Sequence, residues 1–191
     1  MKLVSTLLLG LFLSTSLIAQ EEKKNITSED LPGMDSLNNV VVVGQIDFQQ
    51  DLFALEINLT TLFNQHGIKT KSSLNVVKQG ASATSLANDS IQNLLKEQGF
   101  DTYMLISVRG YDRKFKPSTN ILSLNKNLTS EHLFPLYRDD IVSVTFEITF
   151  YKDGEPVENR LIKIGTVGSQ ESVLKKLNKK MSKLIEKEWK A

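Results

Sequence analysis

The sequence predicts an α/β domain with a mixed β-sheet and three helices packed on it, in the order β-α-β-α-β-β-β-α. Three patterns support this prediction. Apolar residues recur at helical spacing in three segments. Short apolar runs, typical of buried strands, lie before and after the first two of these segments. A segment in which apolar and polar residues alternate leads into an Asp-Gly turn. The chain has 191 residues, of which 40% are hydrophobic and 24% charged, and this composition suits one ordinary globular domain.

Residues 1–19 have the features of a secretory signal peptide, with Lys2 near the start, a short apolar stretch, and Ala19 at the expected cleavage point. The apolar stretch has only about half of the roughly 20 residues that a membrane-spanning helix needs. We therefore expect cleavage after Ala19 and no stable membrane insertion of the mature chain. Residues 20–38 are polar and without periodicity, so we expect a flexible leader before a single domain over residues 39–191.

Charge and cysteine content exclude several functions. The chain has 23 basic and 22 acidic residues, and cleavage removes one basic residue, so a nucleic-acid partner gets no support from the charge. The absence of cysteine excludes a disulfide framework, a thiolate nucleophile, a cysteine-based zinc site and a lipid anchor on cysteine. A secreted chain without disulfides indicates a Gram-negative periplasm rather than an animal extracellular space.

The first half of the domain alternates strands and helices. Residues 40–43 are four consecutive valines, which predict a central strand covered on both faces. Residues 50–66 carry apolar side chains at helical spacing and are followed by Gly67, as is typical of an amphipathic helix that ends in a glycine cap. Residues 68–77 then predict a short edge strand.

The same arrangement follows a second time. A small, polar loop over residues 79–84 leads into a second predicted helix over residues 84–98, which ends before Gly99. Residues 101–109 predict the next strand, because their centre is a run of apolar side chains.

The second half of the domain is predicted to be a hairpin and a helix. Residues 141–151 alternate apolar with polar side chains, so one face of this strand belongs to the core and the other is wet or lightly covered. Asp153-Gly154 suits a tight turn into a partner strand over residues 157–167. Ser169 then begins a helix that runs to the C-terminus.

The element order resembles that of bacterial envelope proteins with the TolB N-terminal or CsgG type of α/β domain. The similarity covers residues 39–189 and lies in the valine-rich first strand, two helices each ended by glycine, and the strand Val-Ser-Val-Thr-Phe-Glu-Ile-Thr-Phe-Tyr before Asp153-Gly154. The resemblance implies a mixed α/β sheet in a protein of the cell envelope. Many proteins of this type are lipoproteins, whereas this chain has no cysteine to lipidate.

We expect no catalytic, cofactor or metal site. The two histidines, His66 and His132, are far apart in sequence, and neither Gly-x-Ser-x-Gly nor His-Glu-x-x-His is present. A carboxylate pair could form from Asp47, after the first strand, and Asp101 or Asp112 around the third, because ligand crevices form at strand ends in open α/β sheets. The simpler interpretation is that these aspartates end strands and start turns.

Two further features have simple structural interpretations, which we favour. The turn from Gly165 to Ser169 could present backbone N–H groups to an anion, but it lacks the lysine of a P-loop, and Ser169 suits a helix N-cap. The last helix carries seven lysines, which could bind a membrane surface or simply form a solvated helix face.

The loop over residues 111–140 is the strongest candidate for a binding site. Loops of this length are uncommon in compact domains unless they bind something or are disordered. The loop is rich in aromatic and arginine residues, which protein interfaces favour. The candidate partner-binding residues are Tyr111, Arg113, Phe115, Phe134, Tyr137 and Arg138. The alternative is a surface crossover whose apolar side chains pack on the sheet.

Together these observations favour a non-catalytic protein, secreted or periplasmic, that acts as a protein-interaction module of the cell envelope. Its partner would be another envelope protein held by the long loop. The alternative is a small-molecule or glycan binding domain, or a hydrolase whose sequence motifs are weak. Its crevice would lie at the strand ends near Asp47 and Asp112. The first function predicts an exposed apolar patch, and the second a concave cavity with convergent polar groups.

Overall fold

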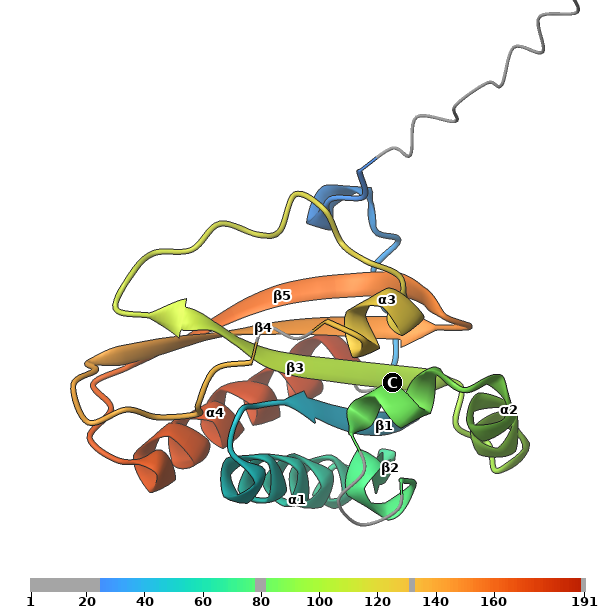
Figure 1. Cartoon of the computed structure of the whole chain (residues 1–191), viewed down its shortest axis with the longest axis horizontal. Coiled ribbons are helices and arrows are strands. Elements are labelled where there is room, and N and C mark those ends of the chain that lie inside the picture. The colour runs from blue at the N-terminus through green and yellow to red at the C-terminus, as the bar shows by residue number, and fades with distance from the viewer. Residues whose placement is uncertain (1–24, 78–81, 131–132, 190–191) are drawn as a thin grey trace, which may run out of the picture.

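The computed structural model describes residues 25–77, 82–130 and 133–189. The predicted signal peptide lies outside these residues. The described chain forms a five-stranded mixed sheet with helices on both faces, which confirms the predicted fold class (Figure 1). The elements are β1 (Asn39–Gln45), α1 (Gln49–Gln65), β2 (Lys69–Ser72), α2 (Asp89–Glu97), β3 (Thr102–Tyr111), α3 (Leu124–Leu128), β4 (Ser143–Lys152), β5 (Glu155–Gly165) and α4 (Gln170–Leu184).

The strands follow the order β2-β1-β3-β4-β5 across the sheet. β1 pairs in parallel with β2 and β3, whereas β4 pairs antiparallel with both β3 and β5. The ends of β1, β3 and β5 and the start of β4 therefore lie together, at what we call the C-terminal end of the sheet. The four valines of β1 are fully buried, as expected for a strand covered on both faces.

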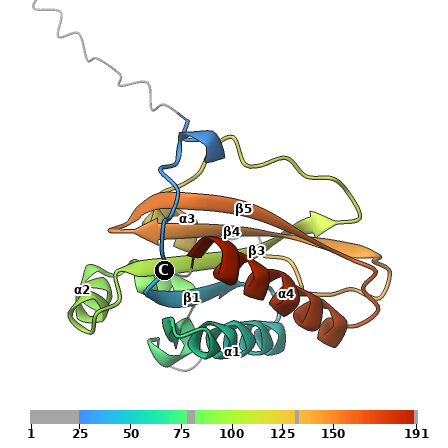
Figure 2. The same ribbon diagram turned by 180° about the vertical axis from the view of Figure 1, so that it is seen from behind.

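Two apolar cores lie on opposite faces of the sheet. α1 and α4 cover one face, where their apolar side chains join those of β1, β3, β4 and β5 (Figure 2). The other core is smaller and joins β1, β3 and the end of β4 to α2, α3 and the 3-10 turn Ala83–Ala87. The rest of this second face, over β3, β4 and β5, carries polar side chains.

The predicted hairpin is present. Asp153 and Gly154 have positive φ angles of 50° and 84°, which are the torsions that a tight turn between antiparallel strands requires. The alternation in β4 places Phe146, Ile148 and Phe150 fully in the core, and Glu147 between them faces the polar side.

The helices differ from the sequence prediction in two places. The segment expected as one helix over residues 84–98 is divided at Asn88, whose side chain accepts a hydrogen bond from Ser90 N at 2.9 Å and so begins α2 as a separate helix. The five-residue helix α3 lies inside the long loop and was not predicted, because it is too short to show helical periodicity.

The C-terminal helix begins as predicted, with the Ser169 hydroxyl accepting from Ser172 N at 3.1 Å. After α4 the chain continues in a π-helical turn, Ile185–Trp189, which places Trp189 fully in the core. The Trp189 ring meets Phe150 edge to face at 4.8 Å between centroids. Its backbone carbonyl accepts from Leu37 N at 2.8 Å, so part of the predicted leader lies against the domain.

Among the described residues no helix is both long and apolar enough to cross a membrane.

Candidate functional site

Tyr111 and Phe134, two of the predicted partner-binding residues, contact each other at the C-terminal end of the sheet. Their rings meet edge to face with centroids 6.2 Å apart. The Tyr111 hydroxyl donates to the backbone carbonyl of Pro135, and the Arg138 guanidinium carbon lies 5.5 Å from the centre of the Tyr111 ring. Burial raises the pKa of Tyr111 to about 12, so its hydroxyl stays protonated and able to donate.

The strand ends hold this part of the loop. Phe134 forms an isolated parallel bridge with Ile46, directly after β1, and its carbonyl accepts from Asp47 N at 3.2 Å. Leu136 is fully buried, and its backbone N–H donates to Asp51 Oδ2 in the first turn of α1 at 2.9 Å. The loop therefore returns to the domain at a defined place, and its side chains there have fixed neighbours.

Four exposed apolar residues belong to the segments that meet at this end of the sheet. Phe48 is 58% exposed and follows Asp47, while Leu133 and Phe134 are 42% and 43% exposed. Val142 is 67% exposed, and its N–H is bonded to Asp112, the neighbour of Tyr111. We call this surface the aromatic end, and it consists of Phe48, Tyr111, Leu133, Phe134, Arg138 and Val142.

The other candidates from the loop lie elsewhere. Arg113 is exposed beyond the end of β3. Phe115 is half-buried with its ring against Gly110, where an added Cβ would lie 2.5 Å from Phe115 Cζ. Tyr137 is half-buried and packs on the core of α1 and α4. The structure therefore brings together Tyr111, Phe134 and Arg138.

The sequence patterns do not predict that two members of the aromatic end, Phe48 and Val142, are exposed. Phe48 has the helical spacing of the buried residues of α1, but the helix begins at Gln49 and Phe48 has an extended backbone, so its side chain points to solvent. Val142 continues the alternation of β4 and was expected in the core, yet it precedes the first residue of that strand. Both are apolar residues just outside an element boundary, which is where periodicity is least informative.

The aspartates near the strand ends have structural contacts. Asp112 has a positive φ of 53°, and its Oδ1 accepts from Val142 N at 2.9 Å and Ser143 N at 2.7 Å. These hydrogen bonds lower the pKa of Asp112, the bond from Ser143 N most, and they fasten the start of β4 to the end of β3. Asp47 is exposed next to Phe134.

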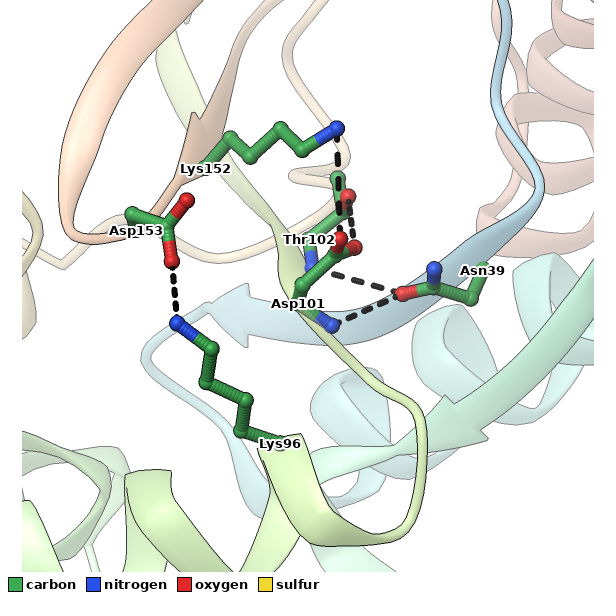
Figure 3. Close-up of polar contacts among 6 residues, drawn as sticks. All are labelled: Asn39, Lys96, Asp101, Thr102, Lys152 and Asp153. Atoms are coloured by element: carbon green, nitrogen blue, oxygen red, sulfur yellow. Dashed lines mark hydrogen bonds and ion pairs between the residues drawn. The ribbon is translucent and has the colours of Figure 1, made fainter.

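Asp101 lies at the opposite end of the sheet from Asp47, because it precedes β3 whereas Asp47 follows the parallel strand β1. Figure 3 shows its surroundings, where Asn39 Oδ1 accepts from the backbone N–H groups of Asp101 at 2.9 Å and Thr102 at 3.3 Å. Lys152 Nζ lies 3.9 Å from the Asp101 carboxylate. Asp101 therefore joins β1, β3 and the hairpin, and a carboxylate pair of Asp47 with Asp101 is not formed.

Two of the remaining sequence candidates, His66 and Lys176, also have structural partners. His66 follows α1, and its Nε2 lies 3.0 Å from the Ser182 hydroxyl, while His132 lies outside the described residues. In the last helix, Lys176 donates to the carbonyls of Gly165 at 3.0 Å and Thr166 at 2.6 Å. This lysine thus stabilises the turn before α4.

A cavity of about 240 Å³ lies on the polar face of the sheet, beneath the long loop. It is not lined by Asp47 or Asp112. Its lining comes from β1, β3, β4 and β5 of the sheet, from the long loop and from α3. Figure 1 shows the course of the loop from β3 to α3. The polar lining residues are Gln45, Ser107, Arg109, Ser118, Asn120, Asn127, Ser130, Glu147, Thr149 and Asn159.

No family model and no curated protein matches the sequence. Among solved structures, the chain is similar to the PelC dodecamer from Paraburkholderia phytofirmans, with a TM-score of 0.43 and 10% identity over 80% of this chain and 90% of that chain. It is also similar to the lipoprotein GNA1162 from Neisseria meningitidis, with a TM-score of 0.36 and 12% identity over 78% of this chain and 97% of that chain. Both are bacterial proteins, and neither carries the name TolB or CsgG, so the resemblance to that type of domain stays a prediction.

Proposed function

We propose that this chain is a non-catalytic protein-interaction module of the bacterial cell envelope, and that it docks a protein partner on the aromatic end. The observation that carries the proposal is the distribution of exposed apolar side chains. Of the six large hydrophobic residues exposed in the described chain, four belong to the aromatic end, namely Phe48, Leu133, Phe134 and Val142. Clustered exposed apolar side chains mark interaction sites, whereas single ones are ordinary.

The chemistry of the aromatic end suits a protein partner. Tyr111 and Phe134 supply aromatic surface, and Arg138 lies over the Tyr111 ring, so the residue types that dominate interface energies are adjacent. The side chains are also held in place, because Phe134 is bridged to Ile46 and the Tyr111 hydroxyl is bonded to Pro135. A surface that is ordered before binding loses less conformational entropy when a partner docks. The envelope location rests on the signal-like residues 1–19.

Site-specific photo-crosslinking in living cells tests the proposal. A photoreactive phenylalanine analogue is placed at Phe48 or at Phe134, and in matched controls at Ile57 or Leu94, which are 60% and 52% exposed but lie on α1 and α2. The proposal predicts the same crosslinked protein from both positions in the aromatic end and none from the controls. Equal crosslinking at all four positions, or none at Phe48 and Phe134, would contradict it.

A further inference from the structure

We propose that the cavity beneath the long loop binds a small, neutral, polyhydroxylated molecule, such as a single sugar residue. This site adjoins the aromatic end, because Phe134 belongs to both, but it lies on the polar face of the sheet and goes beyond the proposed docking function. It rests on which polar atoms of the cavity are already hydrogen-bonded and which are not.

The Glu147 carboxylate lines the cavity, and only one of its two oxygens accepts hydrogen bonds from neighbouring side chains of the described chain. Glu147 Oε1 accepts from Ser118 Oγ at 2.7 Å and from Asn159 Nδ2 at 3.0 Å. Glu147 Oε2 lies 3.6 Å from Arg109 Nε, too far for a hydrogen bond. This second oxygen retains the capacity to accept from a ligand hydroxyl.

The side-chain carbonyl oxygen of Asn159, beside Glu147, also receives no hydrogen bond from the part of the chain that the structure describes. Its Nδ2 donates to Glu147 and to Thr149 Oγ1 at 2.9 Å, so the amide is fixed in orientation. Its Oδ1 is buried and has no hydrogen-bond partner among the described residues. A buried carbonyl oxygen without a donor costs about 1–3 kcal/mol. Less than 1 Å² of Oδ1 is exposed, so a ligand hydroxyl reaches this oxygen only when the amide moves toward the cavity, and the new hydrogen bond would then recover that cost.

The walls of the cavity are preformed. Gln45 Nε2 donates to the Asn127 carbonyl at 2.7 Å, and Asn127 Nδ2 donates to the Tyr151 hydroxyl at 2.6 Å. These two hydrogen bonds connect β1, α3 and β4, so the groups that form them stabilise the walls of the cavity and are not free to bind a ligand. The charged groups left to meet a ligand are therefore Glu147 Oε2 and the guanidinium donors of Arg109, which is 42% exposed. The side chains of Ser107, Asn120 and Ser130 also line the cavity.

A hydroxyl group fits this set because it both donates and accepts. The charged side chains that line the cavity are Arg109 and Glu147, and their charges cancel, so the site favours a neutral ligand over an ion. Leu105, Ile121 and Leu122 line the remainder, with Phe134 at the rim, and give apolar surface for the C–H face of a sugar ring. The cavity of about 240 Å³ has room for roughly eight waters at about 30 Å³ each, which suits one small molecule.

Nuclear magnetic resonance titration of the isotope-labelled mature chain tests this site. The probes are glucose and N-acetylglucosamine as neutral sugars, and glucosamine and glucuronate as cationic and anionic ones. We expect the neutral sugars to bind most tightly and to shift the backbone amides of Glu147, Thr149 and Asn159. The absence of a saturable shift with every probe, or tighter binding of either charged sugar, would overturn the proposal.

Four variants assign the binding to this cavity. Glu147→Gln and Asn159→Ala should each weaken neutral-sugar binding about tenfold, the loss of roughly one hydrogen bond to a ligand. Asn178→Ala is the matched control, because Asn178 Oδ1 is also buried without a partner among the described residues but lines the separate hollow between α1 and α4. Unchanged affinity in Asn159→Ala, or an equal loss in Asn178→Ala, would show that the sugar binds elsewhere. If Glu147→Gln does not fold, Ser118→Ala replaces it. This variant removes only the hydroxyl that donates to Glu147 Oε1 and orients the carboxylate, so it should also weaken binding.

Discussion

Tyr111 and Phe134 meet edge to face, with ring planes at 90° and centroids 6.2 Å apart. Tyr111 is the last residue of β3, and Phe134 returns next to the end of β1, so this contact closes the long loop at its base. The aromatic end is consequently built by two strand ends and the returning loop together. The geometry of the aromatic end therefore depends on the core of the sheet. Variants that weaken the contact between the loop and the strand ends should lower the stability of the whole fold by a measurable amount.

Removal of the Tyr111 hydroxyl should destabilise the protein slightly. In Tyr111→Phe the ring contact with Phe134 remains, but the Pro135 carbonyl loses its donor. We expect the free energy of unfolding to fall by about 1 kcal/mol. Urea unfolding followed by tryptophan fluorescence measures this, because Trp189 is the only tryptophan and is fully buried.

Tyr103→Phe is the matched control for this variant. The Tyr103 hydroxyl is also removed from solvent, and burial raises its pKa to about 12, but it has no hydrogen-bond partner among the described residues. Its loss should leave stability unchanged or increase it. An equal destabilisation by the two substitutions would rule out the Pro135 hydrogen bond as the cause.

Glu56 should be among the most sensitive polar positions in the fold. Its fully buried carboxylate accepts from Gly44 N at 2.7 Å, Ser72 Oγ at 2.6 Å and Ser73 Oγ at 2.7 Å, and thus joins α1 to β1 and β2. Glu56→Ala leaves these buried donors without an acceptor, at about 1–3 kcal/mol each, so we expect a loss of roughly 3 kcal/mol or more. Glu56→Gln keeps one acceptor oxygen and should lose clearly less by the same urea measurement. An equal loss in the two variants would contradict this account, because Gln keeps the shape of the side chain and one acceptor oxygen whereas Ala keeps neither.

Gly110 should not tolerate a side chain. Its φ is 148°, and an added Cβ would lie 2.5 Å from Phe115 Cζ. Gly110→Ala should lower the midpoint of thermal unfolding, with a cost of about 1–3 kcal/mol, because backbone strain and displacement of the Phe115 ring add. Gly168→Ala provides the control, since an added Cβ there has no atom within 4 Å, and it should change stability by less than about 0.5 kcal/mol. Similar midpoints for both variants would contradict this account of the Phe115 contact.

Asp112 should contribute stability that depends on pH. Its pKa in the folded chain is lowered, chiefly by the hydrogen bond from Ser143 N, so the ionised carboxylate favours the folded state. This stabilisation is fully present above the ordinary carboxyl pKa of 3.8 and is lost as the pH falls through the lower folded-state pKa. Asn at this position tolerates the positive φ but has no charge to lose. The difference in unfolding midpoint between the wild type and Asp112→Asn should therefore shrink with acidification, and a constant difference would contradict the prediction.

Much of the fold could be predicted from the sequence because its signals are local. The structure confirms three elements that have a local pattern of burial: the continuous run of valines in β1, the helical spacing in α1 and the alternation in β4. The break of the predicted second helix at Asn88 could not be read from periodicity, because it is decided by one side-chain hydrogen bond to Ser90 N. Capping competes with helix continuation at such a residue.

The candidate site was only partly predictable. Aromatic and arginine content identified the loop, but not which residues meet, since Phe48 belongs to the aromatic end and comes from the segment between β1 and α1. The cavity had one sequence signal, the polar side of β4 with Glu147 at its centre, which indicated a wet or lightly covered face. That the loop covers this face depends on contacts between residues far apart in sequence, such as Ser118 with Glu147. No local pattern encodes such a contact.

Capture of the partner by paired surface variants tests the docking function most directly. Phe48→Ser with Phe134→Ser removes apolar surface from the aromatic end, and Ile57→Ser with Leu94→Ser removes similarly exposed apolar surface elsewhere. Phe48, Ile57 and Leu94 are exposed, so their substitutions should each change stability by less than about 0.5 kcal/mol. Phe134→Ser also loses the ring contact with Tyr111, at about 0.5–1.5 kcal/mol, and urea unfolding verifies that both double variants stay folded. We predict that the first double variant captures at least about tenfold less of the crosslinked envelope protein than the wild type, whereas the second retains it. Equal capture by the two double variants would contradict the assignment of the aromatic end as the docking surface.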